Sequence, residues 1–169
     1  MKKKDKFIWA IKIFIIVLAI AFNVFIIVNS CLDANQSSNE SGKLVNFLVN
    51  IINSIKPDAI NESNIDIFSS VIRKLVGHFL AFTVSGVSTT LSVKFLYFDF
   101  KKKFTIFLFI SCSFGLFLAI LTECIQLFVP GRSGEIRDIL IDFGGYIIGY
   151  LVIALITYFI NKKNTNLEK

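Results

Sequence analysis

The chain has 169 residues, of which 54% are hydrophobic, 14% aromatic and only 18% charged, with a formal net charge of +6. A soluble domain usually carries about 25% charged residues, so this apolar excess is too large for one soluble core to bury. With 2 Pro, 9 Gly and 3 Cys, the composition also excludes a collagen-like chain and a disulfide scaffold. We therefore expect one membrane-embedded domain over residues 1–169.

Four apolar segments are long enough to cross a bilayer, whose hydrocarbon core requires roughly 20 residues of helix. In chain order they cover approximately residues 7–29, 75–96, 104–128 and 139–160. The sequence thus predicts an all-α, polytopic membrane protein built as a four-transmembrane-helix bundle. The first segment ends in Val28-Asn29-Ser30-Cys31, which approaches a lipoprotein cleavage pattern, but its length favours a retained anchor over a cleaved export signal.

A polar segment, residues 30–74, separates the first two spans. Residues 33–39 are typical of a loop, whereas residues 44–55 place Asn46, Asn50 and Asn53 on one side of an amphipathic helix that is too short to span. Pro57 is expected to end this helix. It is interpreted either as a lid packed on the bundle or as an extracytoplasmic interfacial helix that borders a site.

The positions of Lys and Arg predict the orientation of the bundle. With the N-terminus in the cytoplasm, twelve of the 18 basic residues lie on the cytoplasmic side, and nine of the 12 acids lie outside. We therefore predict a multi-pass protein of the cell membrane with both termini cytoplasmic. The net charge indicates topology and attraction to anionic lipid, so nucleic acid is not an expected partner.

Polar side chains at membrane depth are costly unless they face the bundle interior or water. Three spans carry such residues at helical spacing, mixed with small residues that permit close packing. The stripes are Lys74, His78, Ala81, Ser85, Ser88 and Ser92 on the second span, Cys112, Gly115, Ala119, Glu123 and Gln126 on the third, and Asp138, Asp142, Gly145 and Gly149 on the fourth.

The predicted topology brings the charged ends of these stripes to the outer boundary, where the Pro-Gly turn at residues 130–131 adds Arg132. We expect one ligand-binding cluster there. Its members are Arg73, Lys74, His78, Glu123, Gln126, Arg132, Asp138 and Asp142. The helix-packing residues are expected to be Gly115, Ala119, Gly145 and Gly149.

Several of these residues resemble the VanZ-like family of small bacterial membrane proteins. The resemblance lies in Arg73-Lys74, His78, Glu123-Cys124-Ile125-Gln126, Pro130-Gly131-Arg132, Asp138 and the glycines from Gly145 to Gly149. Family members commonly carry Asn near the position of Asp142, so this chain adds a potential negative charge to the site, and the sequence leaves open whether Asp142 is protonated. The resemblance implies a role in resistance to teicoplanin, a lipid-tailed glycopeptide, or in cell-envelope homeostasis, without an established biochemical activity.

The charged residues have other readings. Glu123 with Arg132, or Asp138 with Arg137 or Lys74, could form ion pairs that simply lock the helices together. Alternatively, His78, Glu123 and Asp138 are candidate catalytic residues of an enzyme that acts on an envelope lipid or a lipid-linked precursor. No nucleophile motif accompanies them, so a non-enzymatic role is favoured.

The expected partner is membrane lipid, with a glycopeptide, a lipid-linked envelope precursor or another membrane protein as further candidates. We expect no cofactor and no metal, because a lone His supplies no zinc ligand set. A divalent cation near Asp138 and Asp142 is the alternative. The sequence leaves open a Cys31–Cys124 disulfide and the oligomeric state.

Overall fold

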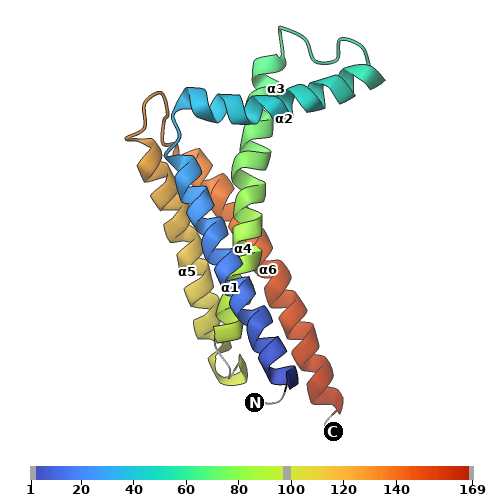
Figure 1. Cartoon of the computed structure of the whole chain (residues 1–169), viewed down its shortest axis with the longest axis vertical. Coiled ribbons are helices and arrows are strands. Elements are labelled where there is room, and N and C mark those ends of the chain that lie inside the picture. Colours follow the sequence, from blue (N-terminus) through green and yellow to red (C-terminus); the bar gives the residue numbers. More distant parts are fainter. Residues whose placement is uncertain (1–2, 97–99, 168–169) are drawn as a thin grey trace.

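The computed structural model describes residues 3–96 and 100–167, in which every regular element is a helix (Figure 1). This confirms the predicted all-α class. The elements are α1 (Lys3–Ser30), α2 (Ala34–Ile55), α3 (Ile65–Ile72), the π-helical segment η1 (Arg73–Leu80), α4 (Ala81–Leu96), α5 (Phe100–Gln126) and α6 (Ile136–Leu167).

Four helical segments of the described chain are long and apolar enough to cross a membrane, as predicted. They are Asp5–Ser30, Ile65–Leu96, Phe109–Gln126 and Ile136–Ile160. In Figure 1, α1, α4, α5 and α6 run lengthwise through one bundle, and α2 lies across one end of it. We call this the α2 end; α1 begins and α6 finishes at the opposite end.

The flanks of the bundle are apolar. Phe14 on α1, Phe117 on α5 and Phe159 on α6 are 66%, 61% and 63% exposed, and many other large aliphatic side chains on these helices are exposed too. Such a surface is unfavourable in water but suits contact with lipid chains. The apolar excess in the composition is therefore located on the outside of the bundle.

Helix α2 begins earlier than predicted, and the expected loop at residues 33–39 is wrong. Asp33 caps the helix: its side chain accepts a hydrogen bond from the Gln36 N–H at 2.8 Å, and the Gln36 side chain accepts one from the Asp33 N–H at 3.3 Å. This reciprocal capping box stabilises a helix start within a polar sequence. At the other end, α2 stops before the extended Lys56, as Pro57 predicts.

The second span begins at Ile65 instead of Leu75, because α3, η1 and α4 follow one another without interruption. The π-helical segment departs from the 3.6-residue period on which the predicted stripe depends. Lys74 and His78 contact acids of α6, whereas the Ser85 hydroxyl bonds to α1. The stripe predicted along one face is thus divided between two neighbouring helices.

Small residues set the spacing of α6. Helix α6 packs most extensively against α4. A Cβ atom on Gly145 would collide with the backbone carbonyl of Phe79, and one on Gly149 would collide with that of Thr83. Close approach of two helix backbones needs such positions. Because Gly145 follows Asp142 by less than one turn, the same approach brings Asp142 to η1.

The core lies where α1, α4, α5 and α6 meet. Gly115 accommodates the ring of Tyr146, which is fully buried. The buried residues of this core are Ile26, Phe82, Leu118, Ala119, Tyr146 and Tyr150. The four residues predicted to pack helices therefore lie at, or next to, interhelical contacts.

Candidate functional site

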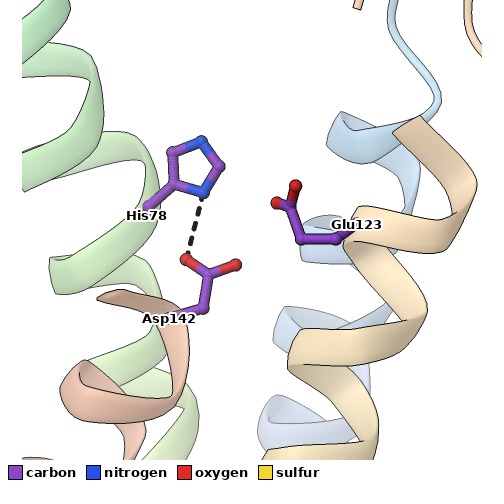
Figure 2. A group of neighbouring side chains, drawn as sticks. All are labelled: His78, Glu123 and Asp142. Carbon is purple, nitrogen blue, oxygen red and sulfur yellow. Dashed lines mark hydrogen bonds and ion pairs between the residues drawn. The ribbon is translucent and has the colours of Figure 1, made fainter. Parts of the chain in front are cut away.

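Three ionisable side chains from three different helices meet near the α2 end. His78 comes from η1, Glu123 from the last turns of α5 and Asp142 from the second turn of α6. One nitrogen or oxygen atom from each lies within 4.8 Å of the others. Figure 2 shows the Glu123 carboxylate facing His78 and Asp142 across a small gap. We call these three residues the charged cluster.

Asp142 is the most constrained member of the charged cluster. The residue is fully buried, and its Oδ1 lies 3.0 Å from His78 Nδ1 in a hydrogen bond. Its second oxygen, Oδ2, is buried and has no hydrogen-bond partner within the described chain. Buried carboxylate oxygens are normally satisfied, because an unpaired one loses the solvation it had in water. The oxygen is therefore free to bind a further group.

Glu123 is also buried, with 2% of its surface exposed, but both of its oxygens are occupied. Oε2 accepts a hydrogen bond from the backbone N–H of Glu135 at 3.0 Å, and Oε1 accepts one from the Gln126 amide at 3.2 Å. In the described residues it forms no ion pair with Arg132. The turn before α6 thus orients this carboxylate by hydrogen bonds.

Asp138 is held outside the charged cluster by Lys74. The Lys74 ammonium lies 2.6 Å from Asp138 Oδ1 and 3.4 Å from Glu135 Oε2. The Lys74–Asp138 pair was among the alternatives from the sequence, whereas Glu135 was not considered. Arg137 is exposed and forms no such pair in the described chain. Asp138 is therefore balanced locally, unlike Glu123 and Asp142.

A pocket of about 270 Å³ opens beside the charged cluster, between α1, α2, η1 and the turn before α6. Its apolar wall includes Phe25, Ile26, Leu44, Ile72 and Phe82. Its charged lining residues are Arg73, His78, Arg132 and Asp142, and Gln126 lies among them. The pocket is therefore lined by both apolar and charged residues.

Helix α2 forms part of this pocket through Ser37, Ser41 and Leu44. Its first turn also contacts the turn after α5, where the Ala34 N–H donates to the Pro130 carbonyl at 3.4 Å. Gly131 occupies this contact with a φ of 73°, a conformation that glycine adopts without strain. The interpretation of α2 as a helix that borders a site is consistent with this arrangement.

Two arginine residues line the pocket. Arg73 and Arg132 are both half-buried and line the pocket, and within residues 3–96 and 100–167 neither forms an ion pair with a carboxylate. Burial, followed by the positive charge of Arg73, lowers the pKa of the Arg132 guanidinium, which Glu123 and Asp138 partly offset. An arginine stays protonated despite such a shift. Two cations that share one pocket favour an anion there.

The eight predicted ligand-binding residues divide into two groups. Five line the pocket, namely Arg73, His78, Gln126, Arg132 and Asp142. The other three are Lys74, Glu123 and Asp138, which do not line it. Glu123 lies directly behind the pocket, since it contacts His78, Gln126 and Asp142, whereas Lys74 and Asp138 pair with each other.

Sequence reasoning missed Asn23, which lies about two turns before the end of α1. Its amide donates to Thr89 Oγ1 at 3.0 Å, and its carbonyl oxygen accepts from Ser85 Oγ at 2.5 Å. We call Asn23, Ser85 and Thr89 the neutral layer. An Asn inside an apolar span is itself a signal of an interhelical hydrogen bond. The cysteines of the described chain, Cys31, Cys112 and Cys124, are free thiols.

Comparison with known proteins agrees with this architecture. The VanZ/LLP1 family model matches residues 12–157, from the first half of α1 into the last third of α6. The search of curated proteins gave no significant match, and neither did the search of solved structures. The match includes every residue of the charged cluster and of the pocket. The chain therefore belongs to the VanZ/LLP1 family, as a membrane protein with four apolar helices.

Proposed function

We propose that this protein binds an amphiphile with an anionic head group at the extracytoplasmic face of the cell membrane. It would thereby contribute to glycopeptide resistance of the teicoplanin type or to cell-envelope homeostasis. One observation carries the proposal: Arg73 and Arg132 line the same pocket, beside an apolar wall, without a carboxylate partner in the described chain.

The chemistry of the pocket favours a phosphate or carboxylate on a lipidic body. A guanidinium presents a planar set of N–H donors that matches either anion, and such charge-assisted hydrogen bonds are stronger than neutral ones. The apolar wall formed by Phe25, Ile26 and Phe82 suits the first carbons of a chain. Lys74 is not available for the head group, because Asp138 and Glu135 already bind its ammonium.

The proposed orientation rests on the distribution of basic residues. Lys6 on α1 and Lys162 on α6 lie toward the end of the bundle opposite α2, which the positive-inside rule assigns to the cytoplasm. The α2 end would then face outward. Glycopeptides and lipid-linked wall precursors are encountered on that side, so the pocket would meet them or the outer-leaflet lipids.

Lipid binding tests the proposal. The purified full-length chain is titrated with phosphatidylglycerol or with phosphatidylcholine of the same acyl chains, and bound lipid is counted by native mass spectrometry. Wild type should prefer the anionic lipid. Arg73→Gln and Arg132→Gln should each weaken this preference about tenfold, since a hydrogen bond to a charged group is worth roughly 1.5–3 kcal/mol. Arg137→Gln is the matched control, because Arg137 is exposed and lies outside the pocket.

The proposed role in teicoplanin resistance needs a separate measurement. Expression in a susceptible Gram-positive host should raise the inhibitory concentration of teicoplanin, and the Arg73→Gln/Arg132→Gln variant should return it to the baseline. Arg137→Gln should retain the increase. Unchanged susceptibility with wild type, at verified membrane expression, would remove the resistance role while leaving the lipid-binding result to stand.

An enzyme that acts on an envelope lipid is the second candidate. The observation in its favour is the His78–Asp142 hydrogen bond, which orients an imidazole next to the pocket as in many general bases. This candidate predicts conversion of envelope lipids by the wild type. Folded His78→Ala and Glu123→Gln variants should then be inactive, and absence of turnover by the wild type across a lipid panel would rule against catalysis.

A further inference from the structure

We propose that the charged cluster binds one divalent transition-metal cation, of the Zn²⁺ or Mn²⁺ class, through His78, Glu123 and Asp142. This site goes beyond the anion-binding function above and does not depend on it. It also differs from the sequence-based expectation, in which Asp138 and Asp142 were the acids considered and no metal was expected.

The three ligand atoms are already close to a coordination geometry. Zinc binds His nitrogen and carboxylate oxygen at about 2.0–2.2 Å, so ligand atoms around one tetrahedral ion lie about 3.4 Å apart. His78 Nδ1 and Asp142 Oδ1 are 3.0 Å apart, and all three ligand atoms lie within 4.8 Å of one another. A side-chain movement of about 1 Å would complete the set, and each Glu123 oxygen keeps a lone pair beside the one hydrogen bond that it accepts.

The unpartnered oxygen of Asp142 is a second, independent observation. Oδ2 is buried and unpartnered within the described residues, while Oδ1 already faces His78. In Figure 2 the Asp142 carboxylate lies below His78, and its oxygen that is not joined to the imidazole is on the side toward Glu123. A cation in this gap would satisfy the oxygen that the protein itself leaves without a partner.

Charge balance points the same way. Glu123 and Asp142 are 2% and 0% exposed, and the cluster contains one imidazole. Two carboxylates with a neutral imidazole carry two negative charges, which one divalent cation cancels. Lys74, which also belongs to η1, is already bound to Asp138 and Glu135. One imidazole with two carboxylates is a ligand set that suits zinc and manganese.

Three protein ligands leave at least one coordination position open, as in catalytic zinc sites. Since His78 and Asp142 line the pocket, that position can face it. The cation and the two guanidinium groups would then share one cavity. A phosphate or carboxylate head group in this cavity could contact all three.

Metal binding to the full-length chain tests the proposal. The untagged protein in detergent is stripped with a chelator and titrated with Zn²⁺ or Mn²⁺, and bound metal is counted by elemental analysis and calorimetry. Wild type should bind one ion per chain. Asp142→Asn and Glu123→Gln should weaken binding at least about a hundredfold, because loss of an outer-shell partner alone costs 10- to 100-fold.

Two controls separate this site from adventitious binding. Asp138→Asn removes a neighbouring acid one turn from Asp142, and it should leave the affinity within about twofold. Cys31→Ser/Cys124→Ser removes the two exposed thiols and should also retain the metal. Retention of the ion by Asp142→Asn and Glu123→Gln, or loss of it in Cys31→Ser/Cys124→Ser, would overturn the assignment.

A second measurement needs no substitution in the cluster. His78 is the one histidine of the chain, so modification by diethyl pyrocarbonate reports on this imidazole alone. Bound Zn²⁺ or Mn²⁺ should slow its modification at least about tenfold, because a coordinated nitrogen is not nucleophilic. An unchanged rate at saturating metal, together with no stoichiometric uptake by the wild type, would mean that the two carboxylates are instead neutralised by protons.

Discussion

The bundle has two polar regions that differ in how completely the protein satisfies them. In the neutral layer, uncharged groups of Asn23, Ser85 and Thr89 bond to one another across α1 and α4. In the charged cluster, two buried carboxylates lie near one imidazole, which hydrogen-bonds to Asp142, and the second oxygen of Asp142 has no partner within the described chain. The polar groups of the neutral layer bond to one another, whereas the charged cluster lies beside a pocket and keeps one buried oxygen without a protein partner in the described chain.

Among the substitutions that test this comparison, the largest loss of stability is expected at the contact that brings α6 to η1. Gly145→Ala places a methyl group against the Phe79 carbonyl, which belongs to backbone and cannot move away cheaply. We expect Gly145→Ala to lower the free energy of unfolding by about 2–3 kcal/mol. It should increase the distance between Asp142 and His78 more than it disturbs the neutral layer. Thermal unfolding in detergent measures this loss.

Gly144→Ala is the matched control, since a Cβ atom at Gly144 meets nothing within 4 Å. It should be neutral or slightly stabilising, by at most about 1 kcal/mol, because alanine favours the helix. Equal destabilisation by the two substitutions would contradict the assigned contact between Gly145 and Phe79.

The next effect concerns the neutral layer. Asn23→Leu removes both interhelical hydrogen bonds and leaves Ser85 and Thr89 to find other partners. We expect a loss of about 1–2 kcal/mol in unfolding free energy, with metal uptake and lipid preference unchanged. A change in either binding property would mean that the two polar regions are coupled, contrary to the distinction drawn between them.

A smaller effect is expected at the Lys74 pair, which lies at the border of the charged cluster. Lys74→Met leaves Asp138 without its cation, while Glu135 remains half-exposed to solvent. The expected cost is about 1 kcal/mol, because the ammonium is partly exposed and an exposed pair contributes little. Lys74→Met/Asp138→Asn should recover most of this loss in the same unfolding assay. Additive losses in the double variant would show that the two side chains do not interact.

The sequence predicts the spans well because span length and charge are local properties. The lengths of the apolar segments were enough to predict four spanning helices. Because α5 reverses into α6, the acids at the end of the third span and at the start of the fourth lie at the same end of the bundle. The Lys74–Asp138 pair was one of the ion pairs considered from the sequence. The lengths of the spans and the end at which the acids gather do not depend on how the helices are rotated about their axes.

The sequence did not predict how each helix is rotated about its axis, nor where a helix is irregular. Nothing in the spacing distinguishes Asp138 from Glu123 as the partner of His78 and Asp142; the choice depends on the rotation of α5 and on the Glu135 N–H that holds Glu123. Because the π-helical segment precedes α4, Ser85 lies on a different face from the one predicted for the stripe. The α2 start was missed although its capping signal, Asp33 with Gln36, was readable.

Photocrosslinking at the pocket tests the central claim most directly, namely that Arg73 and Arg132 hold an anionic amphiphile there. A photoreactive amino acid at Leu44, which lines the pocket, is compared with one at Phe117 on the outer flank of α5. In native membranes, lipid captured at Leu44 should be enriched in anionic head groups at least about tenfold over lipid captured at Phe117, and Arg73→Gln/Arg132→Gln should abolish this enrichment. The same lipid composition at both positions, unaffected by the arginines, would contradict the account.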